Sequence, residues 1–251
     1  MKLRIVLVEP HEAGNVGAAA RAMKNFGFTD LWIAGKRPQR TDDVSDWWAK
    51  GALDVAHAAR HVDSLEEALA DVHLSVATSA VRERHVFEQL TPAEVAQLAG
   101  ETLGDEHILA IVFGREEWGL TGAEMAMCQR TASIPTSPEY PTMNLAQSVA
   151  IFCYEFSRAA AEGGGATPSS DAAALGGEKR HRDPAPGDLL NALNSRTRRL
   201  LLDVGFFAEK APDRMCAELQ ALAGRAQLST REASMLLSFV AHVDKALRRE
   251  K

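Results

Sequence analysis

Two segments of the chain combine polar side chains with irregular backbone in a way that suits ligand binding. The apolar run 108–113 stops at Gly114 and opens into the loop 115–120. A second run, 131–134, opens into the proline-rich loop 135–144. Open α/β sheets build ligand crevices from such loops at the carboxyl ends of their strands. We therefore predict a small-molecule site here, with an ordinary surface connection as the alternative.

The proline-rich loop is predicted to hold its backbone in a fixed shape. Pro135, Pro138 and Pro141 restrict the chain and remove three amide donors. The remaining N–H and C=O groups can then form an array that reads the edge of a flat heterocycle. Beyond the loop, Asn144 is a plausible N-cap of an amphipathic helix that reaches Phe156.

A third polar segment follows the N-terminal strand, which is predicted over 3–8. Asn15 is a good N-cap for a helix over 16–26, and Gly27 is a typical helix stop. Arg21 is a guanidinium in an otherwise small, apolar half-turn of this helix. Composition alone favours a solvent-facing arginine, because arginine is mostly exposed in proteins.

Strands and helices alternate through the first 156 residues. Further strands are predicted over 31–34 and 72–77, and the second of them ends in the polar turn Thr78-Ser79. Between the strands, helices are predicted over 42–60, over 64–70 and from Thr91 onward. This alternation predicts an α/β fold with a mostly parallel sheet and helices on both of its faces.

The chain is predicted to divide into three parts. Residues 1–158 form the α/β domain, 159–187 a flexible linker rich in glycine, serine and proline, and 188–251 a small helical appendage. Residues 1–177 hold 14 Lys and Arg against 24 Asp and Glu, whereas 178–251 hold 14 against 10. The tail is thus +4 and the body −10, an asymmetry that can mark contact with a polyanion or simply a solvated helical face.

Several classes of protein are excluded by missing patterns. No GxGxxG follows the first strand, and there is no P-loop, HExxH or GxSxG motif. Three widely spaced cysteines without a CxxC pair, and eight histidines without metal spacing, predict neither disulfides nor a metal site. A reducing cytoplasm fits this cysteine content. No stretch is long enough to span a membrane, so no membrane partner is expected.

Three segments, 15–24, 111–120 and 134–146, together resemble the signature of the SpoU/TrmH branch of the SPOUT RNA methyltransferases. The bacterial TrmJ subfamily is the most similar, over about residues 3–157 and more loosely in the C-terminal helices. The phrase Thr78-Ser79-Ala80 also matches. The resemblance implies a homodimer, a C-terminal trefoil knot and S-adenosylmethionine as the cofactor. It assigns cofactor binding, chiefly through backbone groups, to Thr78, Ser79, Ala80, Gly114, Ile134, Thr142, Met143 and Asn144.

The same resemblance implies methylation of tRNA on the ribose 2′-oxygen of nucleotide 32, in the anticodon loop. Arg21 would hold the RNA phosphate and stabilise the oxyanion, and it would reach into the partner subunit's cofactor site. Asn15 would orient Arg21 or the ribose, Glu116 would neutralise the sulfonium or order the loop, and Asn144 would complete the catalytic set. RNA binding is expected from Arg21, Arg115, Arg196, Arg198 and Arg199.

Three alternatives stay open at this point. The enzyme could act on ribosomal RNA or on another tRNA nucleotide, because target choice depends on surfaces without a clear pattern. An RNA-binding relative without catalysis is the second alternative, although Asn15, Arg21, Glu116 and Asn144 occur together. A small-molecule α/β binding domain is the third, and the arginine-rich tail makes it less attractive.

Overall fold

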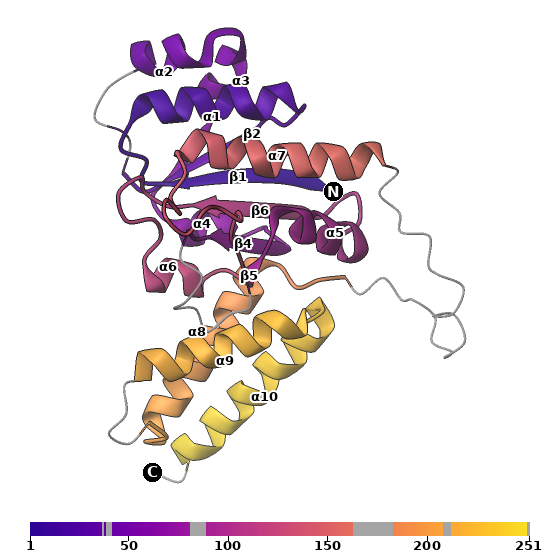
Figure 1. The fold of residues 1–251 in the computed structure, drawn as a ribbon. Coiled ribbons are helices and arrows are strands. Elements are labelled where there is room, and N and C mark those ends of the chain that lie inside the picture. Colours follow the sequence, from indigo (N-terminus) through magenta and orange to yellow (C-terminus); the bar gives the residue numbers. More distant parts are fainter. Residues whose placement is uncertain (37, 39–41, 81–88, 163–182, 208–211, 250–251) are drawn as a thin grey trace.

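The computed structural model describes residues 1–36, 38, 42–80, 89–162, 183–207 and 212–249. Figure 1 shows a sheet between two layers of helices, with a group of three helices below it. The predicted linker falls mostly on 163–182, outside the described residues. A long helix ends at Ala161, before these residues, and another helix begins at Gly187, after them.

The described residues form a seven-stranded sheet in the order β3-β2-β1-β6-β4-β7-β5. Every pairing between these strands is parallel, so all their carboxyl ends lie at one edge. The predicted α/β fold with a mostly parallel sheet is confirmed. The strands are β1 Lys2–Val8, β2 Asp30–Ala34, β3 Arg60–Val62, β4 Leu74–Thr78, β5 Gln89–Leu90, β6 Ile108–Phe113 and β7 Arg130–Ala132.

The central strands are buried on both faces, which explains their continuous apolar sequence. In register, Ile5 of β1 and Val76 of β4 both lie beside Ile111 of β6. Alternate residues face opposite sides, so Ile5 and Ile111 enter one core cluster while Val6 and Val112 enter another. The sheet is therefore a rigid platform for whatever its edge loops carry.

Helices cover both faces of this sheet (Figure 1). The first core cluster lies under α1 Ala13–Asn25, α5 Pro92–Thr102 and α7 Leu145–Ala161. The second lies under α4 Leu65–Leu69 and the short α6 Gly122–Ala126. A further layer packs outside α1 and consists of α2 Asp42–Ala49, the 3-10 turn η1 Lys50–Ala52 and α3 Leu53–His57.

Local signals predicted several helix ends correctly and one wrongly. Asn144 caps α7, because its side-chain oxygen accepts from the backbone N–H groups of Ala146 and Gln147. Gly27 takes a φ of 82° after α1, as a helix stop should. The predicted N-cap at Asn15 is wrong, since α1 begins at Ala13. Asn15 is instead inside the first turn, and its side chain is available for another contact.

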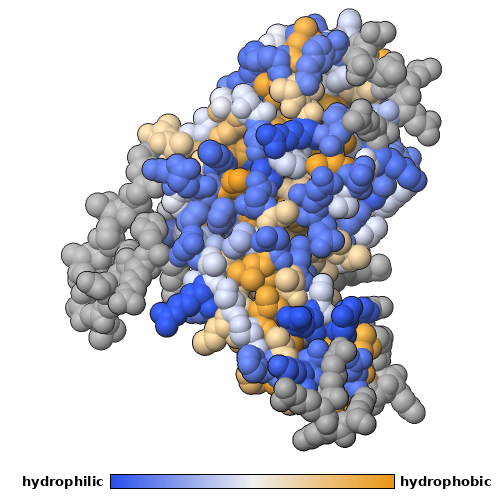
Figure 2. Space-filling model, turned by 180° about the vertical axis from the view of Figure 1, so that it is seen from behind, coloured by the Kyte–Doolittle hydropathy of each residue, from blue (hydrophilic) through white to orange (hydrophobic). Residues whose placement is uncertain are grey.

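Three C-terminal helices, α8 Gly187–Asp203, α9 Pro212–Ala226 and α10 Thr230–Arg249, dock at the amino edge of the sheet. Gly187 N–H donates to the Val72 carbonyl over 2.9 Å. A Cβ at Gly187 would lie 2.2 Å from the Leu69 oxygen, so only glycine fits this approach. Hydrophobic side chains remain exposed on these helices, as at Met235 and Phe239, and Figure 2 shows hydrophobic colour over this lower part.

Candidate active site

The carboxyl ends of three strands are joined directly by hydrogen bonds. Thr78 Oγ1, at the end of β4, donates to the Val112 carbonyl of β6 over 2.9 Å. The next residue, Ser79, donates its backbone N–H to the Ala132 carbonyl of β7 over 3.0 Å. The loops that follow these strands therefore start from fixed positions, and they are the loops in which the sequence predicted a site.

Glu116 connects the loop after β6 to the loop after β1. Its carboxylate accepts from His11 N (2.9 Å), Glu12 N (3.2 Å) and Asn15 Nδ2 (2.9 Å). Partial burial alone would raise the pKa of this carboxyl, but the hydrogen bonds from His11 and Asn15 lower it on balance. Glu116 is thus held as a carboxylate whose oxygens organise the start of α1.

Asn144 extends this network to the loop after β7. Its Nδ2 donates to Asn15 Oδ1 over 2.9 Å, while its Oδ1 caps α7. The direction of each amide is set by its neighbours, because Asn15 must donate to Glu116 and can then only accept from Asn144. Three predicted site residues therefore form one chain of hydrogen bonds, whose two links join residues 101 and 129 positions apart.

Arg115, which was predicted to contact phosphate, is paired with two carboxylates in this structure. Its Nε and Nη2 donate to Glu9 Oε2 over 2.9 and 2.7 Å, and its Nη1 and Nη2 bind the Glu124 carboxylate, each over 3.0 Å. The side chain is only 9% exposed. Hydrogen bonding to Arg115 also holds the pKa of Glu9 below its usual range. Four of its five N–H groups are thus engaged, and the guanidinium links the loops to one another.

Gly114 makes the tight start of this loop possible. A Cβ at this position would lie 2.1 Å from the Gly119 carbonyl carbon, so no other residue fits. Arg115 and Gly119 close the loop through two backbone hydrogen bonds, of 3.2 and 2.9 Å. Gly119 adopts a φ of 72°, which also favours glycine. The loop 114–119 is therefore a compact turn that presents its remaining side chains outward.

The other predicted cofactor residues lie at the same edge. Ala80 follows β4, and Ile134, Thr142 and Met143 belong to the loop between β7 and α7. Ile134 and Met143 are partly buried, whereas Ala80 and Thr142 are exposed. Within the loop, Thr136 Oγ1 donates to the Pro141 carbonyl over 3.1 Å, which links the loop's two ends.

Arg21 was also predicted to be catalytic, but its side chain is not part of the hydrogen-bond chain of Asn15, Glu116 and Asn144. It is exposed, and within the described part of the chain its side chain has no hydrogen bond or ion pair. It lies six positions after Asn15 on α1, about 240° around the helix axis, so the two side chains point in different directions. Arg196, Arg198 and Arg199 are exposed on α8, which docks at the opposite edge of the sheet.

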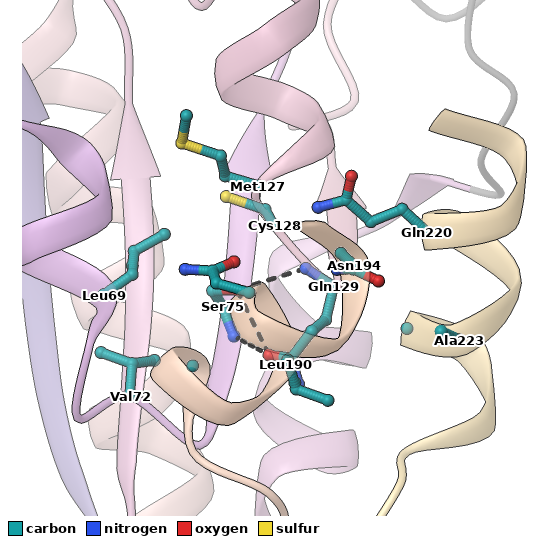
Figure 3. Close-up of a pocket in the computed structure, with 13 residues that line it drawn as sticks. Leu69, Val72, Ser75, Met127, Cys128, Gln129, Leu190, Asn194, Gln220 and Ala223 are labelled. Carbon is teal, nitrogen blue, oxygen red and sulfur yellow. Dashed lines mark hydrogen bonds between the residues drawn. The ribbon is translucent and has the colours of Figure 1, made fainter. Parts of the chain in front are cut away.

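A pocket lies at that amino edge, between the sheet and the C-terminal helices (Figure 3). Ser75 N–H donates to Gln129 Oε1 over 2.6 Å, and Gln129 Nε2 donates to the His73 carbonyl. Burial raises the pKa of the neighbouring Cys128 thiol to about 12, which makes a reactive thiolate unfavourable. These groups bind one another, so the pocket is a packing junction and does not hold the predicted site residues.

Sequence reasoning missed Glu9 and Glu124, the two partners of Arg115. The pattern Thr121-x-x-Glu124 is a visible signal, since it forms the capping box of α6. For Glu9, the only signal in the sequence was its place directly after a strand. Among the described residues no cluster of His, Cys, Asp and Glu could hold a metal ion. No described helix has the length and apolar character that crossing a membrane requires.

The fold and the loops at its carboxyl edge match a known class of RNA-modifying enzyme. The chain belongs to the SpoU rRNA Methylase family, which matches residues 2–154. Relatives define the type more narrowly. The tRNA (cytidine/uridine/adenosine-2'-O-)-methyltransferase TrmJ of Pseudomonas aeruginosa (strain UCBPP-PA14) is 34% identical over 249 residues, 98% of this chain and 95% of that protein.

Two further matches are also to proteins named TrmJ. The tRNA (cytidine/uridine-2'-O-)-methyltransferase TrmJ of Escherichia coli (strain K12) is 34% identical over 245 residues, 96% of this chain and 95% of that protein. The crystal structure of TrmJ from Z. mobilis ZM4 matches with a TM-score of 0.80 and 28% identity, over 97% of this chain and 100% of that one. The predicted resemblance to TrmJ-type RNA 2′-O-methyltransferases is confirmed.

Proposed function

We propose that this enzyme methylates the ribose 2′-oxygen of nucleotide 32 in the anticodon loop of tRNA, with S-adenosylmethionine as the methyl donor. The hydrogen-bond chain Glu116–Asn15–Asn144 carries the proposal, because it joins the three signature segments at the edge where α/β folds bind ligands. TrmJ relatives that align along nearly the whole chain are named as tRNA 2′-O-methyltransferases, which supports tRNA as the substrate.

The carboxyl-edge loops fit the cofactor in one observable respect. The close approach at Gly114 leaves no room for a side chain, so backbone groups line this turn. A structure of the SpoU methyltransferase AviRb in complex with AdoMet shares the fold, with a TM-score of 0.51 and 21% identity. The cofactor supplies a methyl group activated by a positive sulfonium. We assign its binding to Thr78, Ser79, Ala80, Gly114, Ile134, Thr142, Met143 and Asn144.

Arg21 is assigned to the reacting hydroxyl. A ribose hydroxyl is a poor nucleophile until its proton leaves, so the enzyme must position the oxygen and stabilise developing negative charge. An arginine keeps its proton in proteins, which favours an electrostatic role over a general base. Asn15 and Glu116 act on the geometry, because their polar atoms are already engaged with each other and with the α1 entrance.

A homodimer follows from the same assignment. Arg21 is exposed and points away from Asn15 in its own subunit, so we assign it to the partner's cofactor site. A trefoil knot is also proposed. β7 lies between β4 and β5, and Ser133 N–H donates to the Leu90 carbonyl while Ser79 N–H donates to Ala132. β7 and the chain that leaves it thus lie between β4 and β5, and an earlier part of the sequence connects these two strands.

The C-terminal helices are assigned to RNA affinity. Arg196, Arg198 and Arg199 lie exposed on α8, in a tail whose formal charge is +4. Positively charged side chains bind the RNA backbone and release counterions, so the contribution of this helix should fall steeply with salt. Removal of residues 160–251 should therefore weaken tRNA binding and leave cofactor binding intact.

The test is methyl transfer from labelled S-adenosylmethionine to unmodified tRNA and ribosomal RNA, with mass-spectrometric mapping of the product. A 2′-O-methyl group at nucleotide 32 is the expected result. Arg21→Ala should lose about 10²–10³-fold in kcat, the usual effect of removing one oxyanion-stabilising donor. Arg60→Ala, at an exposed arginine on the outer strand β3, is the control and should keep full activity. Methylation of ribosomal RNA alone would overturn the tRNA assignment.

A further inference from the structure

Trp118 is a large aromatic side chain that the fold leaves exposed at the rim of the candidate site. It is 60% exposed, although tryptophan is usually well buried. It lies in the compact turn 114–119, two residues after Glu116. The core clusters of the described residues do not include it. The side chain therefore contributes little to the core and is free to meet a ligand.

The turn fixes the backbone that carries this indole. Arg115 is bound to two carboxylates, Glu116 accepts three hydrogen bonds, and Gly119 pairs with Arg115 through the backbone. The His11 ring meets Trp118 in an edge-on contact, with centroids 5.4 Å apart and planes at 78°. A preorganised aromatic side chain costs little conformational entropy when a ligand binds to it.

Its neighbours also restrict the chemistry of that ligand. Glu117 is exposed beside Trp118, with its Oε1 3.8 Å from His11 Nδ1. A carboxylate at this point repels a phosphate group, so the indole suits an uncharged, flat group better than an RNA backbone. An unpaired nucleobase has such a face, and proteins recognise single-stranded RNA loops by stacking bases on aromatic side chains.

We propose that Trp118 is a stacking platform for an unpaired nucleobase of the RNA substrate, next to the ribose that receives the methyl group. The proposal rests on the proposed function for the identity of the substrate. It follows from continuity with the site, because His11, whose ring makes the edge-on contact with the indole, donates its backbone N–H to Glu116. Stacking beside the target holds the loop open and presents the ribose to the catalytic groups.

The chain offers a matched control at Trp47, which is 64% exposed on α2. Its ring contacts Trp48, with centroids 5.2 Å apart, and the ammonium group of Lys50 lies 5.4 Å from its centroid. α2 packs outside α1 and provides none of the proposed site residues. Removal of this indole deletes a similar exposed surface and leaves the turn 114–119 unchanged.

The experiment compares Trp118→Ala, Trp118→Phe and Trp47→Ala as full-length enzymes. Binding of an anticodon stem-loop RNA and of a fully paired duplex is measured at several salt concentrations, together with KM for RNA and for S-adenosylmethionine. Trp118→Ala should raise the stem-loop Kd and KM about ten-fold, within the range for loss of one base–aromatic stack. Trp118→Phe should recover most of this loss. Trp47→Ala should match the wild type.

Three further readouts separate stacking from other roles. Duplex affinity should not change in Trp118→Ala, since paired bases offer no free face. The slope of log Kd against log salt should also stay the same, because stacking neutralises no phosphate. RNA should quench tryptophan fluorescence in the wild type more than in Trp118→Phe. An unchanged stem-loop Kd in Trp118→Ala, or an equal loss of cofactor binding, would overturn the proposal.

The outcomes also separate this proposal from the proposed function. If the wild type methylates tRNA and Trp118→Ala does so with an unchanged KM, the stacking proposal alone fails. If the wild type binds the stem-loop through Trp118 but methylates no tRNA, the stacking site holds and the assigned substrate is wrong. Quenching that depends on protein concentration and not on RNA would assign Trp118 to a contact between subunits and overturn the proposal.

Discussion

Different kinds of contact hold together the amino edge and the carboxyl edge of the sheet. At the amino edge, backbone groups of the C-terminal segment meet backbone groups of the sheet, as where Gly187 donates to Val72, and the Gln129 side chain bonds mainly to nearby backbone. At the carboxyl edge, side chains from distant loops bind one another, as in the chain Glu116–Asn15–Asn144. Backbone pairing is insensitive to side-chain identity, apart from the glycines that allow close approach, whereas a side-chain network fixes particular atoms in space. The first arrangement suits stability, and the second suits the proposed site.

A substitution at Gly114 should give the largest effect on the carboxyl edge. The Cβ of Gly114→Ala would lie 2.1 Å from the Gly119 carbonyl carbon, so the turn must shift by about an ångström. Such a displacement of reacting groups costs about 10²-fold in rate. Gly122→Ala is the control, because no atom lies within 4 Å of its Cβ position. Equal methyl-transfer rates in both variants would show that the turn does not position the site.

Glu116→Gln tests whether the carboxylate network organises the site. The amide can present only one acceptor oxygen, although His11, Glu12 and Asn15 all donate to the carboxylate. We expect kcat to fall about ten-fold or more, since a donor left without its partner costs about 1–3 kcal/mol. Glu117→Gln alters the exposed neighbour and should leave kcat unchanged. A matching loss in both variants would point to general charge and not to the network.

Arg115→Ala should lower stability and leave RNA affinity alone. It leaves the carboxylates of Glu9 and Glu124, which are 29% and 15% exposed, without their cation. We expect a loss of about 2–3 kcal/mol in the free energy of unfolding, below the 3–5 kcal/mol of a fully buried pair. Denaturant unfolding measures it, and RNA binding over a salt series is the second readout. A smaller dependence of RNA affinity on salt in Arg115→Ala would instead support Arg115 as a phosphate contact.

Gly187→Ala acts on the amino edge and, unlike Arg115→Ala, should also weaken RNA binding. The added Cβ meets the Leu69 oxygen at 2.2 Å, so α8 must move. We expect a loss of about 1–3 kcal/mol, typical of overpacking, with weaker tRNA binding and unchanged cofactor affinity. Gly51→Ala is the control, since its Cβ would have no neighbour within 4 Å. Calorimetric titration with S-adenosylmethionine measures the affinity, and a lost cofactor site would mean that the two edges are coupled.

Acid should destabilise the amino edge and the carboxyl edge of the sheet at different pH values. This effect should be the smallest of those predicted here. Burial and the nearby His107 lower the pKa of His73 below 6.5, so the folded state disfavours its protonation and stability falls as pH drops below 6.5. The pKa of Glu116 is lowered from 4.5, so its contribution is present above 4.5 and is lost only as pH falls through its folded value. Hydrogen exchange should therefore quicken first near α8, and His73→Gln should remove that first step. Simultaneous loss at both edges would contradict this order.

The sequence predicted elements with strong local signals and missed those that depend on distant partners. The strand Ile108–Phe113 and the cap at Asn144 are local features, and both are present. β3 and β5 have only three and two residues, too few for a hydrophobic pattern. Glu9 meets Arg115 across 106 positions, and only the pairing of β1 with β6 brings them together. No spacing along the chain carries that information.

The place of β7 in the sheet has a consequence for synthesis of the protein. β4 is made more than fifty residues before β7, yet β7 separates it from β5. A growing chain that has not yet reached Ala132 therefore keeps one side of β4 unpaired. Unpaired strand edges attract other chains and cause aggregation. Translation that pauses before this point should leave nascent chains that need a chaperone, whereas chains released after α7 can close their own sheet.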